Sequence, residues 1–147
     1  MTLSKLDQLY RQVLLDHNQH PHHVGEITNP TVVQEGSNPS CGDQITVAMV
    51  IKDGLIQDIV WDGCGCAICK ASASMMTDVL WRESLNNATE LAQRFLQMTT
   101  GEDVDVKPLK EARVLAGVKQ FPARIKCATL AWHAALEGLE KVEQGGV

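Results

Sequence analysis

The chain has 147 residues, of which 44% are hydrophobic and 21% charged, and its formal net charge is −5. The length and composition predict one globular domain over 1–147, and the negative charge argues against a basic surface for nucleic acid or anionic lipid. The sequence contains no apolar run long enough to span a bilayer. Because five cysteines occur without a secretory signal, we expect a cytoplasmic protein whose thiols bind metal or react instead of forming disulfides.

The first expected element is a helix whose apolar pattern begins with Leu3, with Ser4 or Thr2 as its N-cap. It should end near 18–20, because Pro21 disfavours helix before it. The leucines along this stretch recur at helical spacing.

A histidine-rich segment follows, with His17 one turn ahead of His20, His22 and His23. A metal site is one interpretation of it. Flexible surface histidines are favoured, because a loop rich in Pro, Gly and Asn gives imidazole neither a fixed geometry nor supporting partners.

The middle of the chain predicts strands at 31–34, 44–51 and 55–61, with Asp53-Gly54 as a hairpin signal between the last two. Helical patterns follow. They cover 67–83, 88–98, 108–117 (with a break at 117–121), and a final helix that begins at Pro122. This order predicts an α+β fold: a three-stranded antiparallel sheet with helices packed on one face.

Three cysteines lie within Gly63-Cys64-Gly65-Cys66-Ala67-Ile68-Cys69, between the last strand and a helix. At an expected helix start, Cys66 is favoured as a thiolate. The C-x-x-C pair of Cys66 and Cys69 fits a redox dithiol or half of a zinc site. Neither pattern is complete, because a zinc ribbon needs a second such pair and a thioredoxin-type site follows a βαβ strand.

The other two cysteines lie far away in sequence. Cys41 falls in a turn-like stretch two residues before Asp43, which is either a turn carboxylate or a metal ligand. Cys127 lies in the second turn of the last helix, between Arg124 and Lys126 on one side and apolar residues on the other. It is either a small buried residue or a thiolate favoured by these two charges.

Four ordered motifs together resemble the IscU/NifU-N iron–sulfur cluster assembly family, and its SufU branch most closely. They are Leu9-Tyr10-Arg11-Gln12-Val13-Leu14-Leu15-Asp16-His17 with Pro21 and Gly25, Asn38-Pro39-Ser40-Cys41-Gly42-Asp43, Gly65-Cys66-Ala67-Ile68 with Ala71-Ser72-Ala73-Ser74-Met75-Met76, and Phe121-Pro122-Ala123-Arg124-Ile125-Lys126-Cys127-Ala128. Two features favour the SufU branch. Lys126 stands where the scaffold branch has histidine, and the gap from Cys66 to Cys127 is longer, with the extra residues expected in 101–118.

The resemblance implies a metal site of Cys41, Asp43, Cys66 and Cys127 that holds Zn²⁺ and takes persulfide sulfur from a SufS-type cysteine desulfurase, making the chain a zinc-dependent sulfurtransferase. Three thiolates and a carboxylate suit tetrahedral zinc. Downstream Suf scaffold proteins are further partners, and neither nucleic acid nor membrane is expected. The alternatives are a scaffold for a [2Fe–2S] cluster on the same ligands and a purely structural zinc domain.

Within that site, Cys41 is expected to be the sulfur acceptor, because it lies on a turn and not on a helix. Arg124 is expected either to hydrogen-bond Asp43 or to steady a departing thiolate, and Lys126 to tune the local charge.

Cys64 and Cys69 depart from the family pattern and could compete for the metal or oxidise with Cys66. Their spacing argues against a ligand role. Cys64 and Cys66 are too close in sequence to share one zinc easily, and Cys69 faces along the helix, where a small packed side chain fits.

Overall fold

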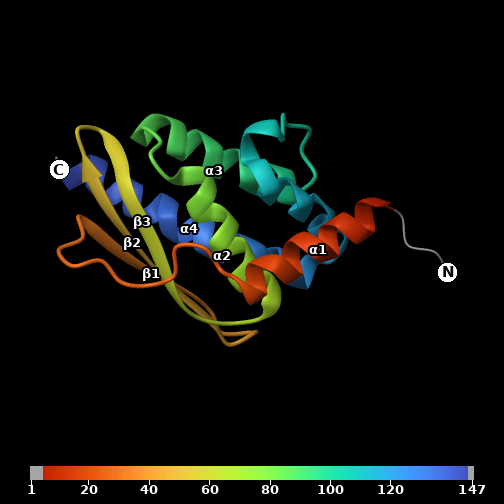
Figure 1. Ribbon diagram of the computed structural model, residues 1–147. Helices are drawn as coiled ribbons and strands as arrows, with labels where there is room; N and C mark the ends of the chain where they lie inside the picture. The colour runs from red at the N-terminus through yellow and green to blue at the C-terminus, as the bar shows by residue number, and fades with distance from the viewer. Residues whose placement is uncertain (1–4, 146–147) are drawn as a thin grey trace.

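The computed structural model of the protein describes residues 5–145 (Figure 1). Leu3 and the proposed caps Thr2 and Ser4 lie outside the described residues. In chain order the elements are α1 (Lys5–Gln19), β1 (Val32–Asn38), β2 (Asp43–Lys52), β3 (Leu55–Cys64), α2 (Ala67–Leu80), α3 (Leu85–Thr99), the 3₁₀-helical segment η1 (Lys107–Gln120) and α4 (Pro122–Gly145).

The three strands form one antiparallel sheet in the order β1-β2-β3, so β2 is central. Asp53 and Gly54 close the β2–β3 hairpin with φ of 55° and 74°, as expected for a tight two-residue turn. One face of the sheet is apolar and buried, with Val47 opposite Trp61 and Met49 opposite Ile59. The predicted α+β fold with a three-stranded antiparallel sheet is confirmed.

The helices cover this buried face. α4 packs against β1 and β2, and α2 packs against β3 and lies beside α4 (Figure 1). A Cβ on Gly138 of α4 would lie 2.9 Å from Met49 Cε, the end of a flexible side chain, so α4 approaches the sheet closely at this position. α3 and η1 extend the core, where Phe95 stacks on Trp132 with ring centroids 4.0 Å apart. No helix in residues 5–145 is long and apolar enough to cross a membrane.

Several boundaries differ from the sequence-based prediction: β1 runs to Asn38, α2 ends at Leu80 and α3 begins at Leu85. Two further differences concern β3 and η1. β3 continues to Cys64 because its pairing with β2 extends through the pair Gln44–Cys64, so part of the cysteine cluster belongs to a strand. The expected break at 117–121 is found at Phe121 alone, because η1 continues to Gln120. Within η1 the non-helical residue is Lys110. The buried residues of η1 recur every three positions, which suits a 3₁₀ helix, whose side chains at i and i+3 eclipse; they are Leu109, Ala112, Leu115 and Val118.

Candidate metal centre

The ends of three structural elements bring four of the sequence-predicted site residues to one end of the molecule. Cys41 lies on the β1–β2 turn, and Asp43 is the first residue of β2. Cys66 is the N-cap of α2, directly after the end of β3, and Cys127 lies in the second turn of α4. The packing of α4 on β1 and β2 places Cys127 beneath the turn that carries Cys41.

Three of these residues form a compact donor set. Cys127 Sγ lies 3.7 Å from Cys41 Sγ, and the ligand atoms of Cys41, Asp43 and Cys127 all lie within 4.8 Å of one another. Donors about 2.0–2.3 Å from a zinc ion in a tetrahedron are separated by about 3.3–3.8 Å. A cation would therefore require only a small contraction of this set.

Cys66 is held beside this set by two hydrogen bonds. Its backbone N–H donates to Asp43 Oδ1 at 2.9 Å, and its sulfur accepts the backbone N–H of Cys69 at 3.4 Å as the cap of α2. Its sulfur is not part of the group within 4.8 Å. Cys66 therefore lies at the edge of the site, on a helix N-terminus that favours a thiolate.

Asp43 gives the clearest sign of what the site holds. The residue is 2% exposed, and Oδ2 is buried with no hydrogen-bond partner among the described residues, whereas Oδ1 accepts the N–H of Cys66. A buried carboxylate oxygen without a partner is costly. A metal cation between this oxygen and the neighbouring sulfurs would remove the cost, so the residues present fit a zinc-type ion.

Gly65 makes the close approach around Asp43 possible. A Cβ at this position would lie 2.6 Å from Asp43 Oδ1 and 3.2 Å from Cys69 Sγ. No side chain larger than hydrogen fits there without displacing the carboxylate. The sequence alone places Gly65 next to Cys66 but does not show that the site requires glycine there.

The thiol of Cys127 is fully buried, and burial is the main cause that raises its pKa, with the neighbouring side chains of Asp43, Cys66 and Cys41 adding to it. Without a cation this thiol therefore stays protonated at neutral pH. A bound metal ion reverses that preference, because coordinating thiols are deprotonated.

Arg124 lies on the exposed side of the site. Its pKa is raised, chiefly by a hydrogen bond to Cys127 and also by the nearby charges of Cys66 and Cys127. No hydrogen bond joins it to Asp43 in the described part of the chain, so Arg124 lies beside the Cys127 sulfur and not beside the carboxylate. Lys126 is exposed on the same turn of α4.

The two additional cysteines have different surroundings. Cys69 is fully buried, and desolvation, followed by the charge of Asp43, raises its pKa to about 12, as expected of a small packed side chain. Cys64 is exposed and pairs with Gln44 of β2, which is also exposed. Asp43, the residue before Gln44 in β2, is buried. Because successive residues of a strand point to opposite faces, Cys64 points away from the donor set.

The histidine-rich segment is not a set of flexible surface side chains, so that interpretation is wrong for its buried member. His17 is 2% exposed and contacts Ser74 and Glu111 with its two ring nitrogens, at 2.6 and 3.1 Å. One ligand atom each of His17, His22 and Asp78 lie within 4.8 Å of one another. His20, in contrast, is exposed.

Comparison with known proteins places the chain in a family. The family described as NifU-like N terminal domain matches residues 9–144. The chain belongs to this family. Its fold is thus that of a family of iron–sulfur cluster assembly proteins.

Full-length relatives carry two different names. A Streptococcus pyogenes protein named iron–sulfur cluster assembly scaffold protein IscU is 44% identical over 142 residues, covering 96% of this chain and 89% of the relative. The zinc-dependent sulfurtransferase SufU of Bacillus subtilis is 40% identical over 144 residues, covering 97% of each chain. A crystal structure from Fervidobacterium islandicum, described as an iron–sulfur cluster assembly scaffold protein for the SUF system, has a TM-score of 0.84 at 30% identity, covering 90% of this chain and 97% of that one.

Proposed function

We propose that this protein is a zinc-dependent sulfurtransferase of iron–sulfur cluster assembly, which accepts persulfide sulfur from a SufS-type cysteine desulfurase and stimulates it. The carrying observation is the donor set of Cys41, Asp43 and Cys127, in which Asp43 Oδ2 is buried with no hydrogen-bond partner in residues 5–145. Cys66 is the fourth proposed ligand. The name of the Bacillus subtilis relative supports the same activity.

The exposures of the cysteines support Cys41 as the sulfur acceptor. Cys41 is exposed on a turn, Cys127 is fully buried, and Cys66 is half-buried at the cap of α2. Zinc, when bound, holds thiolates deprotonated without redox chemistry of its own. The Cys41 sulfur can therefore meet a partner's active site with only the short turn around it moving.

The transfer is a thiol exchange with no net oxidation. The Cys41 thiolate attacks the outer sulfur of the desulfurase persulfide, a new S–S bond forms on Cys41, and the desulfurase cysteine leaves as a thiolate. Arg124, exposed and beside Cys127, supplies positive charge at the mouth of the site for the anionic sulfurs that pass through it. Lys126 adds to that charge.

Trapping of the persulfide tests this proposal. The full-length chain is incubated with a SufS-type desulfurase and cysteine, alkylated, and mapped by mass spectrometry. We expect the added sulfur on Cys41, its loss in Cys41→Ser, and its retention in the matched control Cys64→Ser, which removes another exposed thiol. Stimulation of the desulfurase that survives Cys41→Ser, or persulfide found only on other cysteines, would overturn the assignment.

A scaffold for a [2Fe–2S] cluster is the second candidate, favoured by the name of the relative from Streptococcus pyogenes. It uses the same four ligands. Anaerobic reconstitution separates the two candidates: a stable cluster that transfers to an acceptor protein supports the scaffold, and retention of one zinc ion per chain supports the sulfurtransferase.

A further inference from the structure

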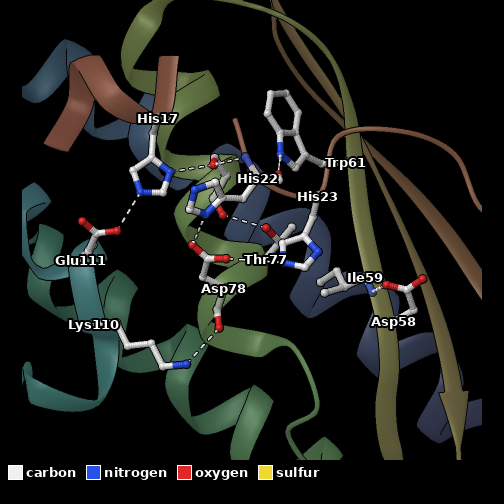
Figure 2. Close-up of polar contacts among 11 residues, drawn as sticks. His17, His22, His23, Asp58, Ile59, Trp61, Thr77, Asp78, Lys110 and Glu111 are labelled. Carbon is white, nitrogen blue, oxygen red and sulfur yellow. Dashed lines mark hydrogen bonds and ion pairs between the residues drawn. The ribbon is translucent and has the colours of Figure 1, made fainter. Parts of the chain in front are cut away.

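A second group of potential metal ligands lies on another part of the molecule, around the middle and end of α2 (Figure 2). It comprises His17 at the end of α1, His22 in the following loop, and Asp78 in the last turns of α2. From this group we infer a second site, separate from the thiolate site, for a divalent transition-metal cation such as Zn²⁺ or Co²⁺.

The distances suit such a cation. One ligand atom from each of the three residues lies within 4.8 Å of the other two. His22 Nδ1 lies 2.5 Å from Asp78 Oδ2, a direct hydrogen bond that would have to lengthen by roughly 1 Å for both atoms to bind one cation. The ring centroids of His17 and His22 are 4.6 Å apart. Imidazole nitrogen and carboxylate oxygen are ligands for zinc, cobalt and iron(II), whereas magnesium and calcium prefer oxygen alone.

The loop that carries His22 is fixed by hydrogen bonds. The backbone N–H of His22 donates to Ser74 Oγ at 2.7 Å, and its carbonyl accepts Trp61 Nε1–H at 2.9 Å (Figure 2). The next residue, His23, accepts the backbone N–H of Trp61 at 3.0 Å. These contacts supply the fixed geometry that metal-binding imidazoles need.

The surrounding groups hold His17 in place by hydrogen bonds, and His22 and Asp78 remain accessible to solvent. His17 has Ser74 on one ring nitrogen and Glu111 on the other, so whichever nitrogen takes the cation, the other keeps a polar partner. The side chains of His22 and Asp78 are 45% and 30% exposed, which gives a cation an entry path.

The charges around the group are mixed and favour a cation on balance. Asp78 and Glu111 supply two carboxylates. His23 Nε2 lies 3.4 Å from Asp78 Oδ1 and would offer a further nitrogen nearby. The Lys110 ammonium contacts the backbone carbonyl of Asp78 at 3.1 Å, and not its carboxylate, so it does not occupy the ligand oxygens.

A cobalt titration of the full-length protein tests the inference. After one equivalent of Zn²⁺ has been loaded, Co²⁺ is added and its binding is followed by equilibrium dialysis and absorption. We expect a second equivalent with a Kd below about 0.1 mM. It should show only weak d–d bands, without the strong near-ultraviolet charge transfer that thiolate ligands produce.

Three variants locate the bound cobalt. His22→Ala and Asp78→Asn should each reduce binding to zinc alone, while the matched control His20→Ala, an exposed histidine two residues away, keeps the cobalt. The retained zinc equivalent shows that each variant is folded. The inference is overturned if the wild type takes no cobalt beyond the zinc, if binding survives both substitutions, or if the cobalt shows sulfur charge transfer, which would place it on thiols.

Discussion

The thiol site and the histidine group both include residues of helix α2 or its cap: Cys66 is its N-cap, and Asp78 lies near its end. The two sites differ in whether their polar atoms have hydrogen-bond partners. At the thiol site, Asp43 Oδ2 is buried and none of the residues that the structure describes hydrogen-bonds to it. In the histidine group, both ring nitrogens of His17 have partners, and Asp78 is paired with His22.

This difference separates a site that depends on a cation from one that can take a cation. A buried unpaired carboxylate oxygen destabilises the fold until something neutralises it. A hydrogen-bonded histidine–carboxylate group is stable as it is, and a metal ion there replaces existing contacts. The two halves of α2 should therefore respond differently to metal removal and to substitution.

Removal of zinc should give the largest effect. Chelation is expected to lower the free energy of unfolding by several kcal/mol, towards the order of 10 kcal/mol typical of structural zinc. Hydrogen exchange should accelerate at 39–43 and 63–67, which carry the proposed ligands, and stay slow around His17. Equal acceleration at both ends of α2 would contradict the comparison.

Asp43→Asn should have opposite effects with and without metal. The amide keeps the shape and the acceptor for the Cys66 N–H but removes the buried charge. Without zinc we expect the variant to equal or exceed the wild type in stability, by up to about 1 kcal/mol. With zinc, the affinity should fall by more than the roughly 10–100-fold typical of residues that only support ligands. Chemical denaturation with and without chelator measures both. Destabilisation of the metal-free protein would count against an unpaired carboxylate.

Gly65→Ala should weaken the thiol site through packing alone. The new Cβ would meet Asp43 Oδ1 at 2.6 Å, so we expect a cost of about 1–3 kcal/mol and a loss of zinc affinity. Gly117→Ala is the matched control, because a Cβ there meets nothing within 4 Å. Thermal unfolding and a competitive zinc assay compare the two. Equal behaviour of both variants would show that Gly65 does not shape the site.

His17→Ala should change stability alone and have the smallest effect on zinc binding. It leaves Ser74 Oγ and Glu111 without one partner each, so we expect a loss of about 1–3 kcal/mol in stability. The zinc equivalent at the thiol site should be unchanged. His20→Ala is the control and should have no effect, since His20 is exposed. A variant as stable as the wild type would mean that the histidine group does not link α1 to α2.

The sequence predicted most of the fold because its signals are local. Alternating strands, the Asp53-Gly54 turn and Pro122 at the start of α4 each act over a few residues. β3 was predicted too short because its last residues, including Cys64, pair with distant partners in β2 and carry no strand pattern of their own. η1 was misjudged because its buried residues recur every three positions, a period that an α-helical template does not match.

The same limit applied to the two clusters. The local sequence pattern predicted that Cys66 lies just before a helix. The full ligand set was predicted only from the resemblance to the IscU/NifU-N family. The unpaired oxygen of Asp43 and the contact of Gly65 with it depend on how the β1–β2 turn, β3 and α2 meet. His17 was taken for a surface residue because its partners Ser74 and Glu111 lie 57 and 94 residues away.

The central claim is that three cysteines and Asp43 hold one zinc ion. X-ray absorption at the zinc edge of the isolated protein measures the ligands directly. We predict three sulfurs at about 2.3 Å and one oxygen at about 2.0–2.2 Å. The account would be contradicted by four sulfurs, which would bring Cys64 or Cys69 into the site in place of Asp43, or by a sphere of nitrogen and oxygen only.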